Sequence, residues 1–137
     1  MPIYRLYADD AGATHIEPMT TDALHFENGP GEFKGVGGTV LGAASRVMLM
    51  RFEEGVRPRL HRANPGMAVL LEGRLTVAVS DGSRVELAPG DAVRIESTGV
   101  GRGGNGGWAP ANPGPGLALL ALTQMPSSGT AVRGERS

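Results

Sequence analysis

The sequence contains no cysteine and carries no excess of charge of either sign. Without cysteine, the chain can form no disulfide, no thiolate metal site and no cysteine nucleophile. Thirteen basic residues stand against fourteen acidic ones, and the net charge of −1 provides no field that would hold nucleic acid or an anionic membrane. We therefore predict neither a nucleic-acid partner nor a membrane partner.

Long apolar runs are also missing. The longest, residues 117–122, is far shorter than the roughly 20 residues that cross a bilayer. Arg5, Asp9 and Asp10 stand where a signal peptide would need an uninterrupted apolar stretch. The sequence therefore predicts a soluble, cytoplasmic protein.

Glycine and proline are abundant, with 22 and 10 copies among 137 residues. Both are costly in helix interiors, so long helices are disfavoured. Turn signals such as Asp81-Gly82 separate short segments in which apolar residues alternate, as Leu75, Val77 and Val79 do, which is typical of antiparallel strands. We predict one all-β domain over residues 1–124, with a flexible tail over 125–137.

Three segments carry more specific predictions. The nearly continuous apolar run Val47–Phe52 predicts a strand covered on both faces, inside a sheet, and Leu117–Thr123 has the same character. Residues 99–116 combine many glycines with one large aromatic side chain, Trp108. Because glycine loses the most backbone entropy on ordering, this segment predicts a mobile loop with Trp108 partly exposed.

The stretch Gly55–Asp91 contains a pattern of wider significance. Gly55 precedes His61 by five intervening residues, and the run VLLEG, an Asp-Gly hairpin and a Pro-Gly-Asp turn follow in order. This pattern resembles the first motif and inter-motif region of the cupins, which are small jelly-roll β-barrels. Residues 4–17 resemble the start of small bacterial cupins of unassigned function. The resemblance covers roughly residues 4–105 and implies a single cupin-type double-stranded β-helix barrel with few or no helices.

The metal-binding pattern of that family is degenerate in this chain. Metal-binding cupins use two His spaced His-x-His, then a Glu, then a third His in a second motif; the corresponding places here hold His61, Ala63, approximately Gly66 and approximately Arg102. A divalent transition metal needs three or four N, O or S donors, and one imidazole does not supply them. We expect no metal and no other cofactor.

His61 is the candidate catalytic base, and Glu96 is its candidate acid/base partner if both side chains face the barrel interior. Strand alternation turns Arg57 and Arg59 to the side of His61, where a guanidinium can bind a carboxylate or enolate oxygen. Arg102 stands near the place of the missing third His and can bind an anionic group at the barrel mouth.

Each of these assignments has a structural alternative. The arginines can be solvated or paired with Glu53 or Glu54, and such exposed ion pairs are mostly inert. Glu96 can pair with a neighbouring arginine, and His61 can be a relic held by a backbone carbonyl.

Met48, Met50 and Met67 can line a pliable apolar pocket, because methionine adapts to irregular ligands, or they can be ordinary core residues. Trp108 is either a lid or interface anchor for a ligand, or a plug that closes the barrel end.

The first functional hypothesis is a metal-independent isomerase or cyclase acting on a small, partly apolar and acidic metabolite. Resemblance to barrels recruited in natural-product pathways favours it. The alternative is a non-catalytic ligand-binding or sensor barrel, and the ligand count disfavours a metal-dependent oxygenase. We also predict a homodimer, because the exposed sheet edge and N-terminal strand of such barrels need covering.

Overall fold

The computed structural model describes residues 3–20, 24, 26–28, 37–96 and 107–126. Every element in these ranges is a strand, as the sequence predicts, and no helix long and apolar enough to cross a bilayer occurs in them. The strands are β1 (Ile3–Ala8), β2 (Thr14–Met19), β3 (Glu27–Asn28), β4 (Gly37–Gly38), β5 (Arg46–Phe52), β6 (Gly66–Glu72), β7 (Leu75–Val79), β8 (Arg84–Leu87), β9 (Ala92–Ile95), β10 (Trp108–Ala111) and β11 (Ala118–Gln124).

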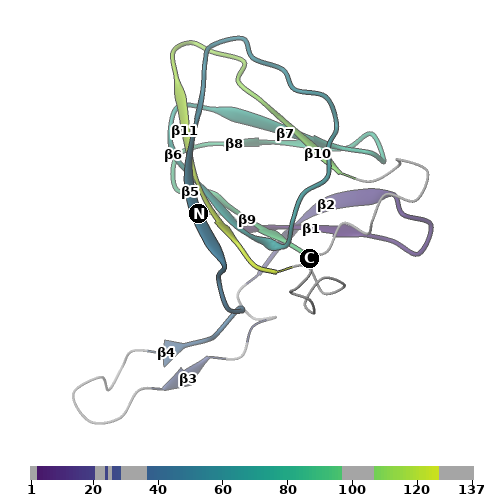
Figure 1. Cartoon of the computed structure of the whole chain (residues 1–137), viewed down its shortest axis with the longest axis vertical. Coiled ribbons are helices and arrows are strands. Elements are labelled where there is room, and N and C mark those ends of the chain that lie inside the picture. The colour runs from purple at the N-terminus through teal and green to yellow at the C-terminus, as the bar shows by residue number, and fades with distance from the viewer. Residues whose placement is uncertain (1–2, 21–23, 25, 29–36, 97–106, 127–137) are drawn as a thin grey trace.

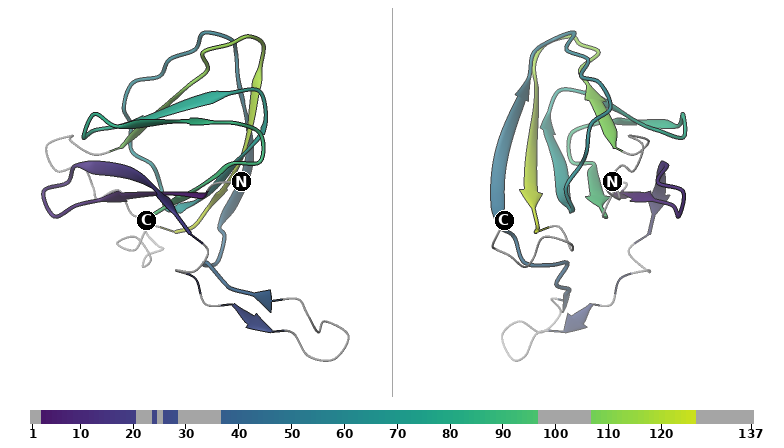
Figure 2. Two further views of the ribbon diagram at one scale, coloured as in Figure 1. Left: turned by 180° about the vertical axis from the view of Figure 1, so that it is seen from behind. Right: turned by 45° about the vertical axis from the view of Figure 1, so that its right-hand side comes forward.

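Two sheets enclose the core (Figure 1). The larger has six strands in the order β2-β1-β9-β6-β11-β5, and the smaller has three in the order β10-β7-β8. An isolated antiparallel bridge from His61 to Trp108 places the segment between β5 and β6 along the free side of β10. The short pair β3-β4 lies apart from the two sheets (Figure 2).

The order in which the chain visits these sheets identifies the fold. From β5 the chain passes to the His61 segment beside β10, returns to the large sheet as β6, crosses as β7 and β8, returns as β9, crosses as β10 and ends in the large sheet as β11. This interleaving of two four-membered sets of strands is the jelly-roll arrangement. The predicted all-β jelly roll is therefore confirmed. The hairpin β1-β2 extends the larger sheet, since β1 pairs in parallel with β9.

The core lies between the two sheets and follows the predicted alternation. Leu75, Val77 and Val79 of β7 are buried, whereas the residues between them face outward and are partly exposed. Leu70 of β6 and Leu120 of β11 meet them from the larger sheet. The sheet faces that point at each other are thus apolar, as expected of a filled barrel interior.

One strand differs from its prediction. The apolar run 47–52 does form β5, but β5 is the edge of the larger sheet, and Val47 and Leu49 are 74% and 68% exposed. Strand β11, by contrast, lies between β6 and β5, as its apolar character predicts. Apolar residues on the outer face of β5 gave the same continuous pattern that full burial would give.

Thr14 is fully buried, and its hydroxyl links the β1-β2 hairpin to the barrel through hydrogen bonds. Its Oγ1 donates to the carbonyl oxygen of Gly107 at 2.7 Å and accepts from the backbone N–H of Ser80 at 2.9 Å. The backbone N–H of Thr14 in turn donates to Ser80 Oγ at 2.7 Å. One side chain therefore joins β2, the turn after β7 and the residue before β10.

The neighbouring residue, His15, makes a second connection at the surface. Its Nε2 lies 2.7 Å from Asp9 Oδ2, and its Nδ1 lies 2.6 Å from Asp81 Oδ2. Carboxylates only accept, so the doubly protonated ring satisfies both bonds. The hydrogen bond to Asp9, supported by that to Asp81, raises the pKa of His15. The bond to His15 lowers the pKa of Asp9, and hydrogen bonds from Ser83, aided by the bond to His15, lower the pKa of Asp81.

Candidate ligand-binding cavity

A cavity of about 130 Å³ lies between the inner face of β5 and the segment that holds His61. Its wall is mostly apolar, with an imidazole, a guanidinium and two amides at its polar side. The lining residues are Met48, Met50, His61, Arg62, Ala63, Asn64, Ile95, Trp108, Leu122 and Gln124.

Backbone pairing fixes the polar side of the cavity. His61 and Trp108 exchange two backbone hydrogen bonds, of 3.0 and 2.9 Å, and their rings lie 6.4 Å apart between centroids. Gly107 precedes Trp108 with a φ of +117°, and a Cβ there would stand 2.4 Å from the His61 carbonyl oxygen. Only glycine permits this close approach. Gly107 thus allows Trp108 to lie alongside His61.

The His61 ring is oriented by its own backbone. Nδ1 lies 2.9 Å from the carbonyl oxygen of Arg59, and a carbonyl can only accept, so Nδ1 carries the proton. In the neutral ring this leaves Nε2 with a free lone pair, ready to accept a hydrogen bond or a proton. The backbone bond expected of a relic histidine is present, and it also sets the tautomer that a base requires.

Trp108 differs from its prediction. It begins strand β10 and is 3% exposed, so the prediction of a partly exposed side chain in a mobile loop is wrong for this residue. Residues 108–111, within the predicted loop, are held by pairing to β7, and Trp108 also pairs with His61. Residues 99–106 lie outside the described residues. Trp108 therefore forms part of the cavity wall and the core together.

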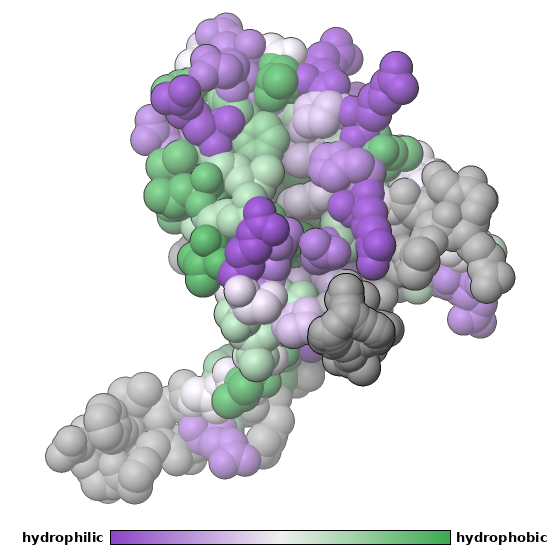
Figure 3. All heavy atoms as spheres, in the orientation of Figure 1, coloured by the Kyte–Doolittle hydropathy of each residue, from purple (hydrophilic) through white to green (hydrophobic). Residues whose placement is uncertain are grey.

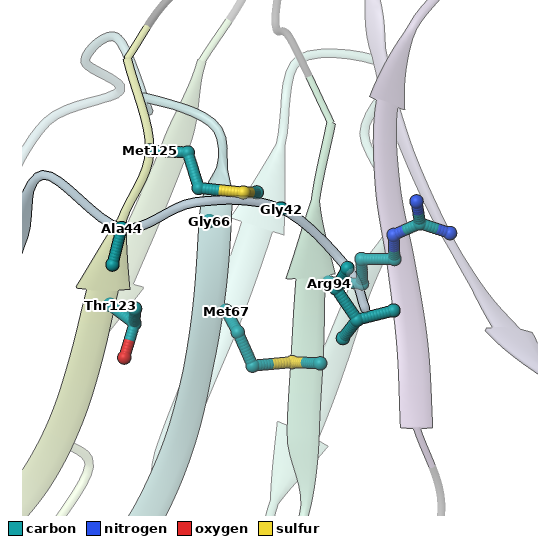
Figure 4. Close-up of a pocket in the computed structure, with 8 residues that line it drawn as sticks. Gly42, Ala44, Gly66, Met67, Arg94, Thr123 and Met125 are labelled. Carbon is teal, nitrogen blue, oxygen red and sulfur yellow. The ribbon is translucent and has the colours of Figure 1, made fainter. Parts of the chain in front are cut away.

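Of the three methionines expected in one pocket, the structure brings Met48 and Met50 together. Both lie on the inner face of β5, opposite Leu122 and Leu120 of β11. Met67 lies on the outer face of β6, because the alternate residues Gly66 and Ala68 are the buried ones. There it lines a separate hollow of about 160 Å³ together with Met125 (Figure 4).

Glu96 does not meet His61. Its neighbour Ile95 faces the cavity, so alternation turns Glu96 outward, together with Arg94. The Glu96 carboxylate accepts from Arg5 of β1 at 2.7 and 3.1 Å, and this bond raises the pKa of Arg5. Glu96 therefore lies on the outer face, and of the two interpretations of this residue, the pairing with an arginine is the one that holds.

The arginines predicted to bind an anion beside His61 do not lie together in the structure. Arg59 is exposed and contributes only its carbonyl to His61. Arg57 lines a hollow on the outer face of the smaller sheet, away from the His61 cavity. Residues 57–60 form no regular strand, so alternation does not carry over from His61 to Arg57. Arg102 lies outside the described residues.

Sequence reasoning missed Arg62, Asn64 and Gln124, which line the cavity together with His61. Strict alternation would turn the adjacent residues His61 and Arg62 to opposite sides, but both line the cavity because the segment is irregular there. Gln124 could have been found, since it lies two residues beyond the inward-facing Leu122 on the same strand.

The cavity lining does not fit a transition metal. Beside the single imidazole stand two neutral amides and a guanidinium, and no carboxylate or second imidazole is among the lining residues. Across the described residues, no three His, Asp or Glu side chains are grouped so that they could hold a metal ion. A site with one good donor and a nearby cation disfavours a divalent ion.

Comparisons with known proteins bear on the fold alone. No protein-family model and no curated protein matches the chain. A sugar phosphate isomerase from a cupin superfamily, from Silicibacter pomeroyi, is 19% identical with a TM-score of 0.46, over 79% of this chain and 75% of that one. A Cupin 2 conserved barrel domain protein from Salinispora arenicola is 18% identical with a TM-score of 0.47, over 81% of this chain and 88% of that one. The CENP-C cupin domain of Drosophila melanogaster is 16% identical with a TM-score of 0.46, over 77% of this chain and 78% of that one. At this distance, the strand order described above remains what identifies the cupin-type jelly roll.

Proposed function

We propose that this chain is a small-molecule-binding barrel whose cavity takes a small, partly apolar ligand. Met48, Met50, Leu122 and Trp108 supply apolar walls, and the free Nε2 of His61 offers one directional polar contact. An engineered apolar cavity of roughly 150 Å³ holds benzene, so about 130 Å³ suits a ligand with a single ring or a short branched chain. Flexible methionine walls can enlarge it slightly.

The observation that carries this proposal is the orientation of His61. Its Nδ1–H is committed to the Arg59 carbonyl, so Nε2 is the group left to a ligand. Arg62 adds a positive charge to the same wall, which favours a ligand carrying a carboxylate or another anionic group. The predicted acidic character of the ligand is thus supported by Arg62 rather than by Arg57 or Arg59.

We favour a binding function over a catalytic one because Glu96, the expected acid/base partner of His61, does not lie in the cavity. Glu96 is paired with Arg5 on the outer face. A metal-independent isomerase or cyclase is the second candidate. In it, His61 alone would take a proton from carbon and return it to a different atom of the same molecule, while Arg62 stabilises the intervening anion.

Binding can be tested with benzoate and its neutral counterpart, benzyl alcohol. We expect both to alter the fluorescence of Trp108, and benzoate to bind more tightly because of Arg62. His61→Ala should weaken benzyl alcohol, whose hydroxyl can donate to Nε2, by about two- to tenfold, the worth of one hydrogen bond between neutral groups. Leu60→Ala is the matched control, since Leu60 is 45% exposed beside His61 and does not line the cavity. Equal losses in both variants, or no response to either probe, would refute the proposal.

Catalysis is separated from binding by solvent exchange. A base that removes a carbon-bound proton in D₂O returns deuterium to the ligand. A ligand that binds, yet gains no deuterium and is recovered unchanged, identifies a binding barrel. Deuterium gain that disappears in His61→Ala identifies the isomerase or cyclase.

A further inference from the structure

The outer face of the smaller sheet carries a hollow that is distinct from the His61 cavity. It measures about 400 Å³ and is lined by Gly55, Arg57, Thr76, Arg84, Ala111, Asn112 and Pro113. Its residues come from β7, β8, β10 and the segment after β5, so four neighbouring lengths of chain contribute. Figure 3 shows hydrophilic side chains gathered over the segment between β5 and β6, whereas apolar ones gather over β5 and β11.

The register of the sheet explains the shape of this hollow. On β7, Thr76 and Ala78 face outward, because Leu75, Val77 and Val79 face the core. Thr76 lies opposite Ala111 of β10, and Ala78 lies opposite Ala109. Of these small side chains, Thr76 and Ala111 line the hollow and form its low floor. Arg84, opposite Ala78 on β8, and Arg57, from the segment beyond β10, carry the long side chains that line it.

Neither guanidinium has a carboxylate partner within the part of the chain that is described. The nearby acidic groups are engaged elsewhere: Glu86 binds Arg74 at 2.7 Å, and Glu53 lies 3.4 Å from Arg51. Glu54 accepts from the backbone N–H of Gly116 at 3.1 Å. Two cations therefore line one hollow without a counter-charge from these residues, and each offers a fork of donors suited to a carboxylate or phosphate.

We infer that this hollow is a second binding site, which takes a small molecule bearing a phosphate or carboxylate group between Arg57 and Arg84. The anion neutralises both guanidinium groups, and the Thr76 hydroxyl can donate to a third oxygen. The hollow is larger than a single ion needs, so the anionic group is one part of a larger ligand. The inference does not depend on the proposed role of the His61 cavity.

The test is a titration of the full chain by calorimetry with pyrophosphate and with citrate, which separate phosphate from carboxylate, and with glucose as an uncharged comparison. We expect one or both anions to bind and glucose not to bind. Arg57→Gln and Arg84→Gln should each weaken the anion at least tenfold. Both side chains are exposed, so the variants should fold, as circular dichroism can verify.

Arg74→Gln is the matched control. It removes the same charge from the same sheet, but Arg74 is already paired with Glu86, so anion affinity should change less than twofold. Ala111→Leu keeps every charge and fills the floor, and it should also abolish binding. His61→Ala should leave anion binding unchanged, which separates this site from the barrel cavity. An equal loss in Arg74→Gln, full binding in Ala111→Leu, or no binding of either anion in the millimolar range would overturn the inference.

Discussion

Replacement of Thr14 by valine should destabilise the chain far more than its small change in shape suggests. Valine has nearly the same shape and suits a strand, so the substitution leaves no cavity and costs nothing in strand propensity. What it removes is Oγ1, the hydrogen-bond partner of the Gly107 carbonyl and the Ser80 N–H. With Thr14 fully buried, water cannot replace it.

The magnitude follows from the two groups left unpaired. A buried donor or acceptor without a partner costs about 1–3 kcal/mol, so Thr14→Val should lower the free energy of unfolding by about 2–6 kcal/mol. That is a large share of the roughly 5–15 kcal/mol that stabilises a typical domain. The bond to Ser80 Oγ, at 3.0 Å, is also lost, but Ser80 is partly accessible and can find water.

Urea unfolding followed by Trp108 fluorescence measures this effect, because Trp108 is the only tryptophan and is 3% exposed when folded. The midpoint should fall while the slope stays constant. Thr123→Val is the control, since Thr123 is half-buried on a strand and its hydroxyl forms no hydrogen bond with the described residues. A loss of less than about 1 kcal/mol, or equal losses in both variants, would refute the view that Thr14 fastens the hairpin to the barrel.

Three further predictions concern metal content, pH and association. Protein purified without chelator should carry less than about 0.2 equivalents of Fe, Mn, Ni or Zn, because one imidazole does not hold such ions; stoichiometric metal that is lost in His61→Ala would contradict this. The raised pKa of His15 contributes stability that is complete below the ordinary value of about 6.5 and is lost as the pH rises through the raised value. The lowered pKa values of Asp9 and Asp81 contribute stability that is lost as the pH falls through them, so the excess stability of wild type over His15→Gln should be greatest in mildly acidic solution and should shrink on either side. A difference that does not vary with pH would exclude the ion pairs as its source. If the predicted homodimer forms along the free edge of β5, Leu49→Lys on the exposed outer face of that strand should yield monomers by sedimentation. Val40→Lys, at an exposed residue outside β5, should leave the dimer intact, and a monomeric wild type would contradict the predicted dimer.

Alternation in the sequence predicted the local structure of this chain well. The pattern of Leu75, Val77 and Val79 gave β7 and its buried face, and the turn at Asp81-Gly82 gave the hairpin to β8. Period-two patterns work here because both strands of that hairpin have one face in the core and one in solvent. A different argument, that a continuous apolar run marks a strand covered on both faces, failed for β5, whose outer face is apolar yet uncovered.

The site was harder to predict because it depends on contacts between distant segments. Nothing near Glu96 in the sequence indicates that Arg5, 91 residues away, will take its carboxylate. Nothing near Arg57 indicates that Arg84 will line the same hollow. His61 and Trp108 were each singled out, but their backbone pairing follows from the jelly-roll topology rather than from either local pattern.

The parallel pairing of β1 with β9 has a consequence for how the molecule is assembled. The β1-β2 hairpin closes from nearby residues, but the strand on which it packs, β9, is complete only at Ile95, 76 residues after the hairpin ends at Met19. During that interval the hairpin and, later, the edge of β9 are each without a partner. An edge that accepts its own hairpin accepts an identical hairpin from another copy through the same hydrogen bonds. When this chain is synthesised at high local concentration, we therefore expect domain swapping, in which each copy completes the larger sheet of the other, to be the main route of misassembly.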